Sequence, residues 1–197
     1  MLDKKILIIG GGGIGSYLVA ELNDVVAYEQ ISPYTKFCVA DADIVELKQL
    51  RYQKFDEAGK NKAKSLKKMY DKILDIQAYD KRITREGQLI GFGIIILCVD
   101  NEKTRKLVMD YCYKTNKEFI DLRATGRRIF ALPKQRLQKD SLKFVDEEDN
   151  REYSCQEKED KEQGRIQLGN RIVARIGVQM LLNLLRGHSN KILSVVI

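Results

Sequence analysis

A run of glycines near the amino terminus has the spacing of a phosphate-binding turn. It lies between an apolar segment, residues 5–9, and an amphipathic segment that begins at residue 13. Its members are Gly10, Gly11, Gly12, Gly13 and Gly15, followed by Ser16. Glycines let a backbone approach a phosphate closely, and the first turn of a helix offers N–H groups and a positive dipole end. The segment therefore predicts a phosphate site, although a tight turn without a ligand has the same pattern.

An acidic residue further along the chain decides which nucleotide the turn suits. A dinucleotide site needs an acid about 20 residues after the glycines, at the end of a strand, to hold the ribose. Glu29 has roughly that spacing, but it follows a stretch that the first helix absorbs. A convincing strand runs through "KFCVADAD" and ends at Asp41 and Asp43, which lie too far along for the dinucleotide pattern. This spacing favours ATP over NAD.

Strand-like and helix-like segments alternate along the chain, which predicts an α/β fold with a mostly parallel sheet flanked by helices, of the Rossmann-like kind. We expect one nucleotide-binding domain over residues 1–197, with a charged crossover loop over 133–165. The expected strands are 5–9, 36–47, 76–84, 91–100, 118–122, 127–132 and 191–197, and the expected helices are 13–28, 60–73, 102–116 and 169–187.

Composition narrows the class of protein. The net charge of +7 is spread over lysine-rich segments without a recognition motif, so we do not expect nucleic acid as a partner. The four cysteines contain no Cys-x-x-Cys pair, which argues against zinc and against a disulfide framework and favours a reducing, cytoplasmic location. The longest uncharged stretch, residues 6–20, is too short and too glycine-rich to cross a membrane.

Five motifs in order give the chain a specific resemblance to a known superfamily. The glycine turn is followed by Asp-x-Asp, by "QLRYQ" at residues 49–53, by "GKNKA" at 59–63, and by an apolar strand that ends in Asp100-Asn101. This order resembles the superfamily of ThiF, MoeB and the ubiquitin-activating enzymes. The carboxyl-terminal segment "IQLGNRIVARIGVQMLLNLLRG" is similar to that of plasmid- and phage-type ThiF-like proteins.

The resemblance implies an activity and a role for each matching residue. It implies ATP-dependent adenylation of the C-terminal carboxylate of a small ubiquitin-like or sulfur-carrier protein. The glycine backbone would hold the phosphates, and Gln53 would be among the other ATP-binding residues. Asp43, next to Asp41, would bind the ribose hydroxyls, Lys62 would place a positive charge beside the α- and β-phosphates, and Asp100 would hold Mg²⁺.

Two positions leave alternatives open. Tyr52 stands where the family has arginine. Arg51 is the nearest residue whose guanidinium could replace the missing one. Without such a replacement, the chain would be a catalytically impaired scaffold that binds a nucleotide or a partner. Cys155 lies in the charged loop where some family members carry an acyl-accepting thiol. Its neighbours are mostly acidic, which disfavours a thiolate, so an incidental cysteine is the other interpretation.

The last predicted helix carries more apolar residues than one core-facing stripe needs. We therefore expect a homodimer, as in the family, with burial inside the monomer as the alternative. These apolar residues are Ile172, Val173, Ile176, Met180, Leu181, Leu184 and Leu185.

Overall fold

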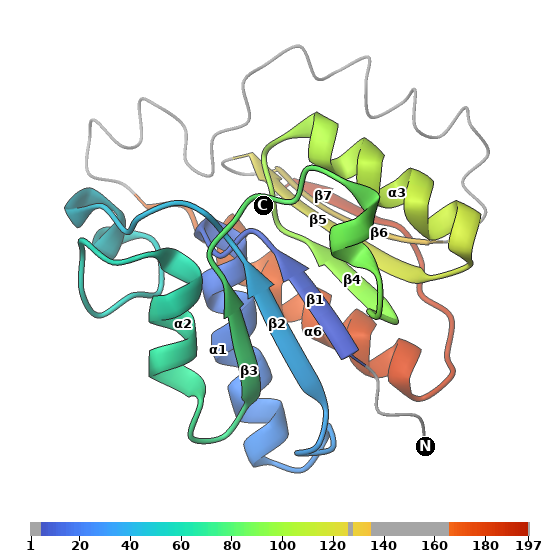
Figure 1. Cartoon of the computed structure of the whole chain (residues 1–197), viewed down its shortest axis with the longest axis horizontal. Coiled ribbons are helices and arrows are strands. Elements are labelled where there is room, and N and C mark those ends of the chain that lie inside the picture. Colours follow the sequence, from blue (N-terminus) through green and yellow to red (C-terminus); the bar gives the residue numbers. More distant parts are fainter. Residues whose placement is uncertain (1–4, 126–127, 135–165, 197) are drawn as a thin grey trace.

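The centre of the fold is β1 (Lys5–Ile9), a strand that is buried from Ile6 onward. In the computed structural model, which describes residues 5–125, 128–134 and 166–196, β1 lies in a seven-stranded sheet with the order β3-β2-β1-β4-β5-β6-β7. The first five strands are parallel, and β6 and β7 extend the sheet in antiparallel pairing. This confirms the predicted Rossmann-like α/β fold (Figure 1).

The elements follow the predicted alternation with different bounds: most are shorter than predicted, whereas β5 is longer. The other strands are β2 (Lys36–Ala40), β3 (Asp75–Tyr79), β4 (Ile94–Leu97), β5 (Glu118–Thr125), β6 (Arg128–Pro133) and β7 (Leu193–Val196). The helices are α1 (Gly13–Ala27), α2 (Lys62–Tyr70), α3 (Glu102–Thr115) and α6 (Gly169–Leu185), with two short 3₁₀ helices, η1 (Leu47–Arg51) and η2 (Glu86–Leu89).

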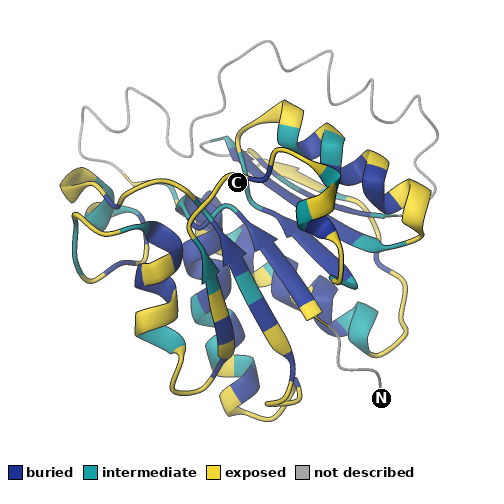
Figure 2. Cartoon of the chain, in the orientation of Figure 1, coloured by how far each residue is buried: buried dark blue, intermediate teal, exposed yellow. Residues whose placement is uncertain are grey.

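The two faces of the sheet are covered by different helices. Alternate residues of a strand point to opposite faces, so Ile6 and Ile8 join the core beneath α1, α2 and α6, whereas Leu7 and Ile9 join the core beneath α3 and η2. The central strands β1 and β4 are accordingly buried on both sides, while the outer faces of the helices are exposed (Figure 2). A site is therefore expected near the ends of these strands.

The α6 helix buries its apolar residues within the chain. Val173, Met180 and Leu181 are buried, and the remaining apolar residues of the predicted set are partly buried against the same core, where α6 lies on α1, β5 and β6. The excess of apolar residues on this helix is therefore explained by burial inside one chain, which was the alternative to a homodimer. The homodimer itself stays a prediction. Among the described helices, none is long and apolar enough to span a bilayer.

Candidate nucleotide-binding site

A pocket of about 410 Å³ opens where β1, β2, β4 and β5 end. Because these strands are parallel, their carboxyl ends meet at one edge of the sheet, and the loops that follow them line the pocket. Its lining is rich in charged and amide side chains: Asp41, Asp43, Asp100, Lys62, Arg82, Arg105, Arg123, Gln49, Gln53 and Asn101. The pocket therefore suits a polar, charged ligand.

Two of the glycines are required by close packing. Gly10 has φ +94°, and a Cβ there would lie 2.6 Å from the carbonyl oxygen of Cys98. A Cβ on Gly15 would lie 1.9 Å from the carbonyl oxygen of Gly10. Both positions thus bring β1, the start of α1 and the residue after β4 together, and Gly15 does not itself line the pocket.

The glycines between them face the pocket at the start of α1. Gly12 and Gly13 line it, and the N–H groups of a helix's first turn have no acceptor within the helix, so they can bind an anion. Ser16 lies one turn further along and is buried, with its hydroxyl accepting the Lys54 amide at 3.0 Å. The structure therefore places Ser16 in the packing beneath the pocket.

Asp41 joins the end of β2 to the glycine turn. Its Oδ2 accepts the amide of Gly11 and its Oδ1 accepts the amide of Asp43. Burial raises the pKa of the Asp41 carboxyl, and the two amides and Lys62 oppose that rise. The Gly11 amide is therefore committed to Asp41 in this structure.

Asn61 holds the start of α2 against β2 and so positions Lys62. Its side chain caps the helix by accepting the Lys64 amide at 3.0 Å, and its Nδ2 donates to the carbonyl oxygens of Asp41 and Asp43. The Lys62 amide also donates to the Asp43 carbonyl at 2.9 Å. As a result the Lys62 side chain is only 7% exposed, and its Nζ lies 3.7 Å from Asp43 Oδ2 and 3.9 Å from where a Cβ on Gly12 would be.

The η1 helix presents Tyr52 and Gln53 to the pocket and leaves Arg51 outside it. Gln53 is buried, and among the described residues its Oε1 finds no hydrogen-bond partner. Arg51 is exposed and does not line the pocket. The cation that was expected near Tyr52 therefore does not come from Arg51 in this arrangement.

Asp100 follows β4 and leads into α3. Asn101 caps that helix by accepting the Thr104 amide at 3.2 Å, which leaves Asp100 exposed at the pocket's edge. The described residues hold no cluster of three or more acidic, histidine or cysteine side chains. Asp100 alone could serve Mg²⁺, which is commonly held by one or two carboxylates together with phosphates and water.

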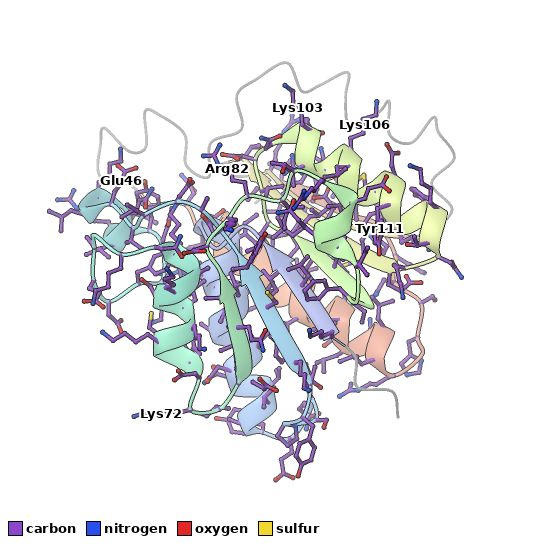
Figure 3. All side chains as sticks on the ribbon, in the orientation of Figure 1. Glu46, Lys72, Arg82, Lys103, Lys106 and Tyr111 are labelled. Atoms are coloured by element: carbon purple, nitrogen blue, oxygen red, sulfur yellow. The ribbon has the colours of Figure 1, made fainter. Side chains whose placement is uncertain are left out.

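The pocket is also lined by three arginines that the sequence motifs did not indicate. Arg82, from the loop after β3, donates to Asp43 Oδ1 at 3.1 Å, and it lies at the same end of the sheet as Lys103 at the start of α3 (Figure 3). Arg105 comes from α3 and Arg123 from β5. The sequence near residue 82 has no motif that identifies Arg82 as a pocket residue, because its approach to Asp43 depends on the pairing of β2 with β3.

Cys155 and the charged segment around it lie outside the described residues. Among the described cysteines, Cys112 is buried, and burial raises the pKa of its thiol to about 12. Cys112 is therefore a core residue that stays protonated near neutral pH.

Comparison with known proteins identifies the family. Residues 1–195 match the ThiF family. The chain belongs to the ThiF family. No curated protein matches it in sequence.

Solved structures share its fold at low sequence identity. The E. coli MccB structure with ATP has a TM-score of 0.72 at 14% identity over 99% of this chain and 61% of that one. MccB with N-formylated MccA has a TM-score of 0.72 at 15% identity, over 99% and 62%. SeMet PaaA has a TM-score of 0.68 at 15% identity, over 99% and 64%. The chain thus spans less than two thirds of each of these proteins.

Proposed function

We propose that this ThiF-family chain binds Mg-ATP in the pocket and adenylates the C-terminal carboxylate of a small ubiquitin-like or sulfur-carrier protein. The observation that carries the proposal is the position of Lys62, whose Nζ lies between Asp43 and the start of α1. An ATP whose ribose hydroxyls bind Asp43 and whose phosphates meet the Gly12 and Gly13 amides would pass directly beside this amine. The relatives support it, since MccB was crystallised with ATP and with the peptide MccA.

The reaction follows from this placement. A carboxylate oxygen of the substrate attacks the α-phosphorus, the bond from that phosphorus to the oxygen bridging to the β-phosphate breaks, and pyrophosphate leaves. Negative charge grows on the phosphate oxygens, and a fixed amine beside them stabilises the transition state more than bound ATP. Asp100 would hold Mg²⁺, which would neutralise phosphate charge.

The buried amide of Gln53 supports a polar ligand at the same place. Its Oε1 lacks a partner among the described residues, and its Nε2 lies 3.9 Å from where a Cβ on Gly12 would be. Buried polar groups are rarely left unpaired, so a ligand or water is expected there. The oxygen needs a hydrogen-bond donor, which a nucleotide hydroxyl group or a bound water would supply, while the amide nitrogen could donate to a phosphate.

A scaffold that binds nucleotide without turnover is the second candidate. Tyr52 in the pocket and Arg51 outside it favour this function, because neither supplies a positive charge to a phosphate there. The two functions differ in what Lys62 does. In a scaffold, its loss would weaken ATP binding and leave no turnover to lose.

The test is carboxylate-dependent ATP–pyrophosphate exchange with Lys62→Ala. Small ubiquitin-like and sulfur-carrier proteins serve as substrates, and the same proteins with an amidated C-terminus serve as blanks. We expect Lys62→Ala to lower exchange on the order of 100-fold, with a smaller loss of ATP affinity by calorimetry. Lys67→Ala, an exposed lysine of the same helix, is the matched control. Exchange that survives Lys62→Ala would refute the enzyme.

A further inference from the structure

Arg105 is held in a buried position beside the turn that carries Asp100. This turn, residues 98–101, joins the end of β4 to the start of α3, and it lines the pocket. The Arg105 side chain comes from the first turn of α3 and is only 3% exposed. A buried guanidinium is costly to desolvate, so its N–H groups need good acceptors. The position of those acceptors indicates which part of the site Arg105 holds.

Three nitrogens of Arg105 donate to acceptors from three places in the chain. Nε donates to Oδ1 of Asp121 on β5 at 3.2 Å, and Nη1 donates to Oε1 of Glu102 at 2.6 Å. Nη2 donates to the backbone carbonyl of Val99. Asp121 is fully buried and its other oxygen accepts from Arg123, so the anchor on β5 is itself fixed. Arg105 thus ties the turn after β4 to the neighbouring strand of the sheet.

The Val99 carbonyl belongs to the peptide group that leads into Asp100. A peptide group is planar, so a hydrogen bond that fixes its oxygen also fixes the plane that contains the Asp100 nitrogen. On the other side of Asp100, Asn101 caps α3 by accepting the Thr104 amide at 3.2 Å. The exposed side chain of Asp100 therefore extends into the edge of the pocket from a backbone that is fastened on both sides.

We propose that Arg105 is a positioning residue for the Mg²⁺ of the bound nucleotide, because it fixes the backbone from which the Asp100 carboxylate would reach the metal. The inference rests on the proposed Mg-ATP site. Mg²⁺ demands nearly ideal octahedral geometry, and groups that orient a metal ligand contribute to metal affinity without touching the metal. A lysine at this position would keep the positive charge and lose the planar fork that reaches Asp121, Glu102 and Val99 together.

The test measures how much Mg²⁺ each variant needs to bind AMPCPP, a non-hydrolysable ATP analogue. Calorimetry gives the Mg²⁺ concentration at half-maximal binding and, in EDTA, the affinity for the metal-free nucleotide. We expect Arg105→Lys to raise that Mg²⁺ concentration about threefold to tenfold and to change the metal-free affinity less than twofold. In the Asp100→Asn background, Arg105→Lys should add less than about twofold, because two residues that act through one contact are not additive.

Two variants of the same helix are the matched controls. Val108→Ala removes buried packing beneath α3 and should lower stability without touching the turn. Lys106→Gln removes an exposed charge next to Arg105 in sequence. Both should keep the Mg²⁺ dependence of wild type, and urea unfolding checks that each variant folds.

A measurement on wild type keeps the inference testable if Arg105→Lys does not fold. NMR relaxation should give the amides of residues 99–101 order parameters of about 0.85 without Mg²⁺ or nucleotide, because the turn is already fixed. Values below about 0.6 would overturn the inference. So would a folded Arg105→Lys protein with the Mg²⁺ dependence of wild type.

The two affinities separate this inference from the proposed function. If Arg105→Lys weakens metal-free binding as much as binding with Mg²⁺, the inference is overturned, since Arg105 would then serve the nucleotide directly. A wild type that binds AMPCPP equally well in EDTA and in Mg²⁺ would instead refute the proposed metal site, on which the inference rests.

Discussion

The Oδ2 atom of Asp41 accepts a hydrogen bond from the Gly11 amide at 2.7 Å, which fastens the glycine turn to the end of β2. The other carboxylate oxygen accepts the amide of Asp43 at 2.8 Å. One side chain therefore sets the distance between the glycine backbone that we propose binds the phosphates and the Asp43 carboxylate that we propose binds the ribose. We therefore expect Asp41 to affect ATP binding indirectly, by fixing the positions of the Gly11 and Asp43 backbone.

Asp41→Asn should destabilise the fold and weaken ATP binding together. An amide side chain has one acceptor oxygen, so one of the two backbone amides loses its partner at a cost of about 1–2 kcal/mol. Urea unfolding measures the first effect and calorimetry the second. Asp80→Asn, an exposed carboxylate after β3, is the control and should change neither. An unchanged urea unfolding midpoint in Asp41→Asn would show that the Gly11 and Asp43 amides can hydrogen-bond to water instead.

The pH dependence of that stability difference has a definite sign. Burial raises the pKa of Asp41 above 3.8, so ionisation costs more in the folded protein than in the unfolded chain. The advantage of wild type over Asp41→Asn should be largest below pH 3.8, fall as pH rises through the raised pKa, and then stay constant. Urea unfolding at several pH values measures it. A rising advantage would mean that the amide hydrogen bonds outweigh desolvation.

Gly12→Ala and Gly15→Ala should separate binding from folding. A methyl group at Gly15 would meet the Gly10 carbonyl, and we expect a loss of at least about 2 kcal/mol in unfolding free energy. At Gly12 the nearest atoms are 3.9 Å away, so Gly12→Ala should fold normally and lose ATP affinity, because the methyl group occupies phosphate space. Thermal unfolding and ATP titration check both. Equal losses of stability and of ATP affinity in the two variants would contradict a packing role for Gly15 and a binding role for Gly12.

Arg82→Ala should weaken ATP binding more than adenosine binding. Arg82 and Asp43 form an exposed ion pair, which ribose hydroxyls can displace at small cost, and the released guanidinium can then face the phosphates. Adenosine offers no phosphate, so it loses nothing from the change. Calorimetry with both ligands measures the ratio, and Lys81→Ala, the exposed neighbour, is the control. Equal losses for both ligands would show that Arg82 serves the nucleoside.

Asp100→Asn should raise the Mg²⁺ concentration needed for ATP binding. The substitution keeps the size of the side chain and removes the charge that a hard cation prefers. Titrating Mg²⁺ at fixed ATP, with binding followed by calorimetry, gives the shift, which we expect to exceed tenfold. Asp110→Asn, an exposed acid on α3, should leave the titration unchanged. A Mg²⁺ dependence equal to that of wild type would remove Asp100 from the metal site.

The sequence predicted the elements better than the ends of the elements. The apolar run 5–9, the glycine turn and the helix after it were specified by local pattern, and β1 and α1 match them. The predicted strand 76–84 ends instead at Tyr79, because the segment after it turns around Gln88, whose side chain bonds the backbone at Arg82, Thr84 and Arg85. Such a turn depends on one amide and leaves no periodic signal.

The pocket residues also fall into those that the sequence predicted and those that it did not. Asp43, Lys62 and Asp100 lie in the pocket because motifs adjoin strand ends, and strand ends can be read from hydrophobic runs. Arg82 and Arg123 reach it through strand order, which joins β2 to β3 and β4 to β5. Arg51 does not line the pocket, because the place of a side chain on η1 depends on how that short helix lies on the protein, which a neighbouring position in sequence does not determine.

The strand order has a consequence for synthesis on the ribosome. β1 pairs with β4, and α1 packs on α6, which the ribosome makes long after α1. Until α6 has been made, the apolar side chains of α1 that face it have no partner, so the nascent chain exposes an apolar helix surface. This part of the core can therefore form only after α6 has been translated, and chains that stop before α6 should depend on chaperones or aggregate.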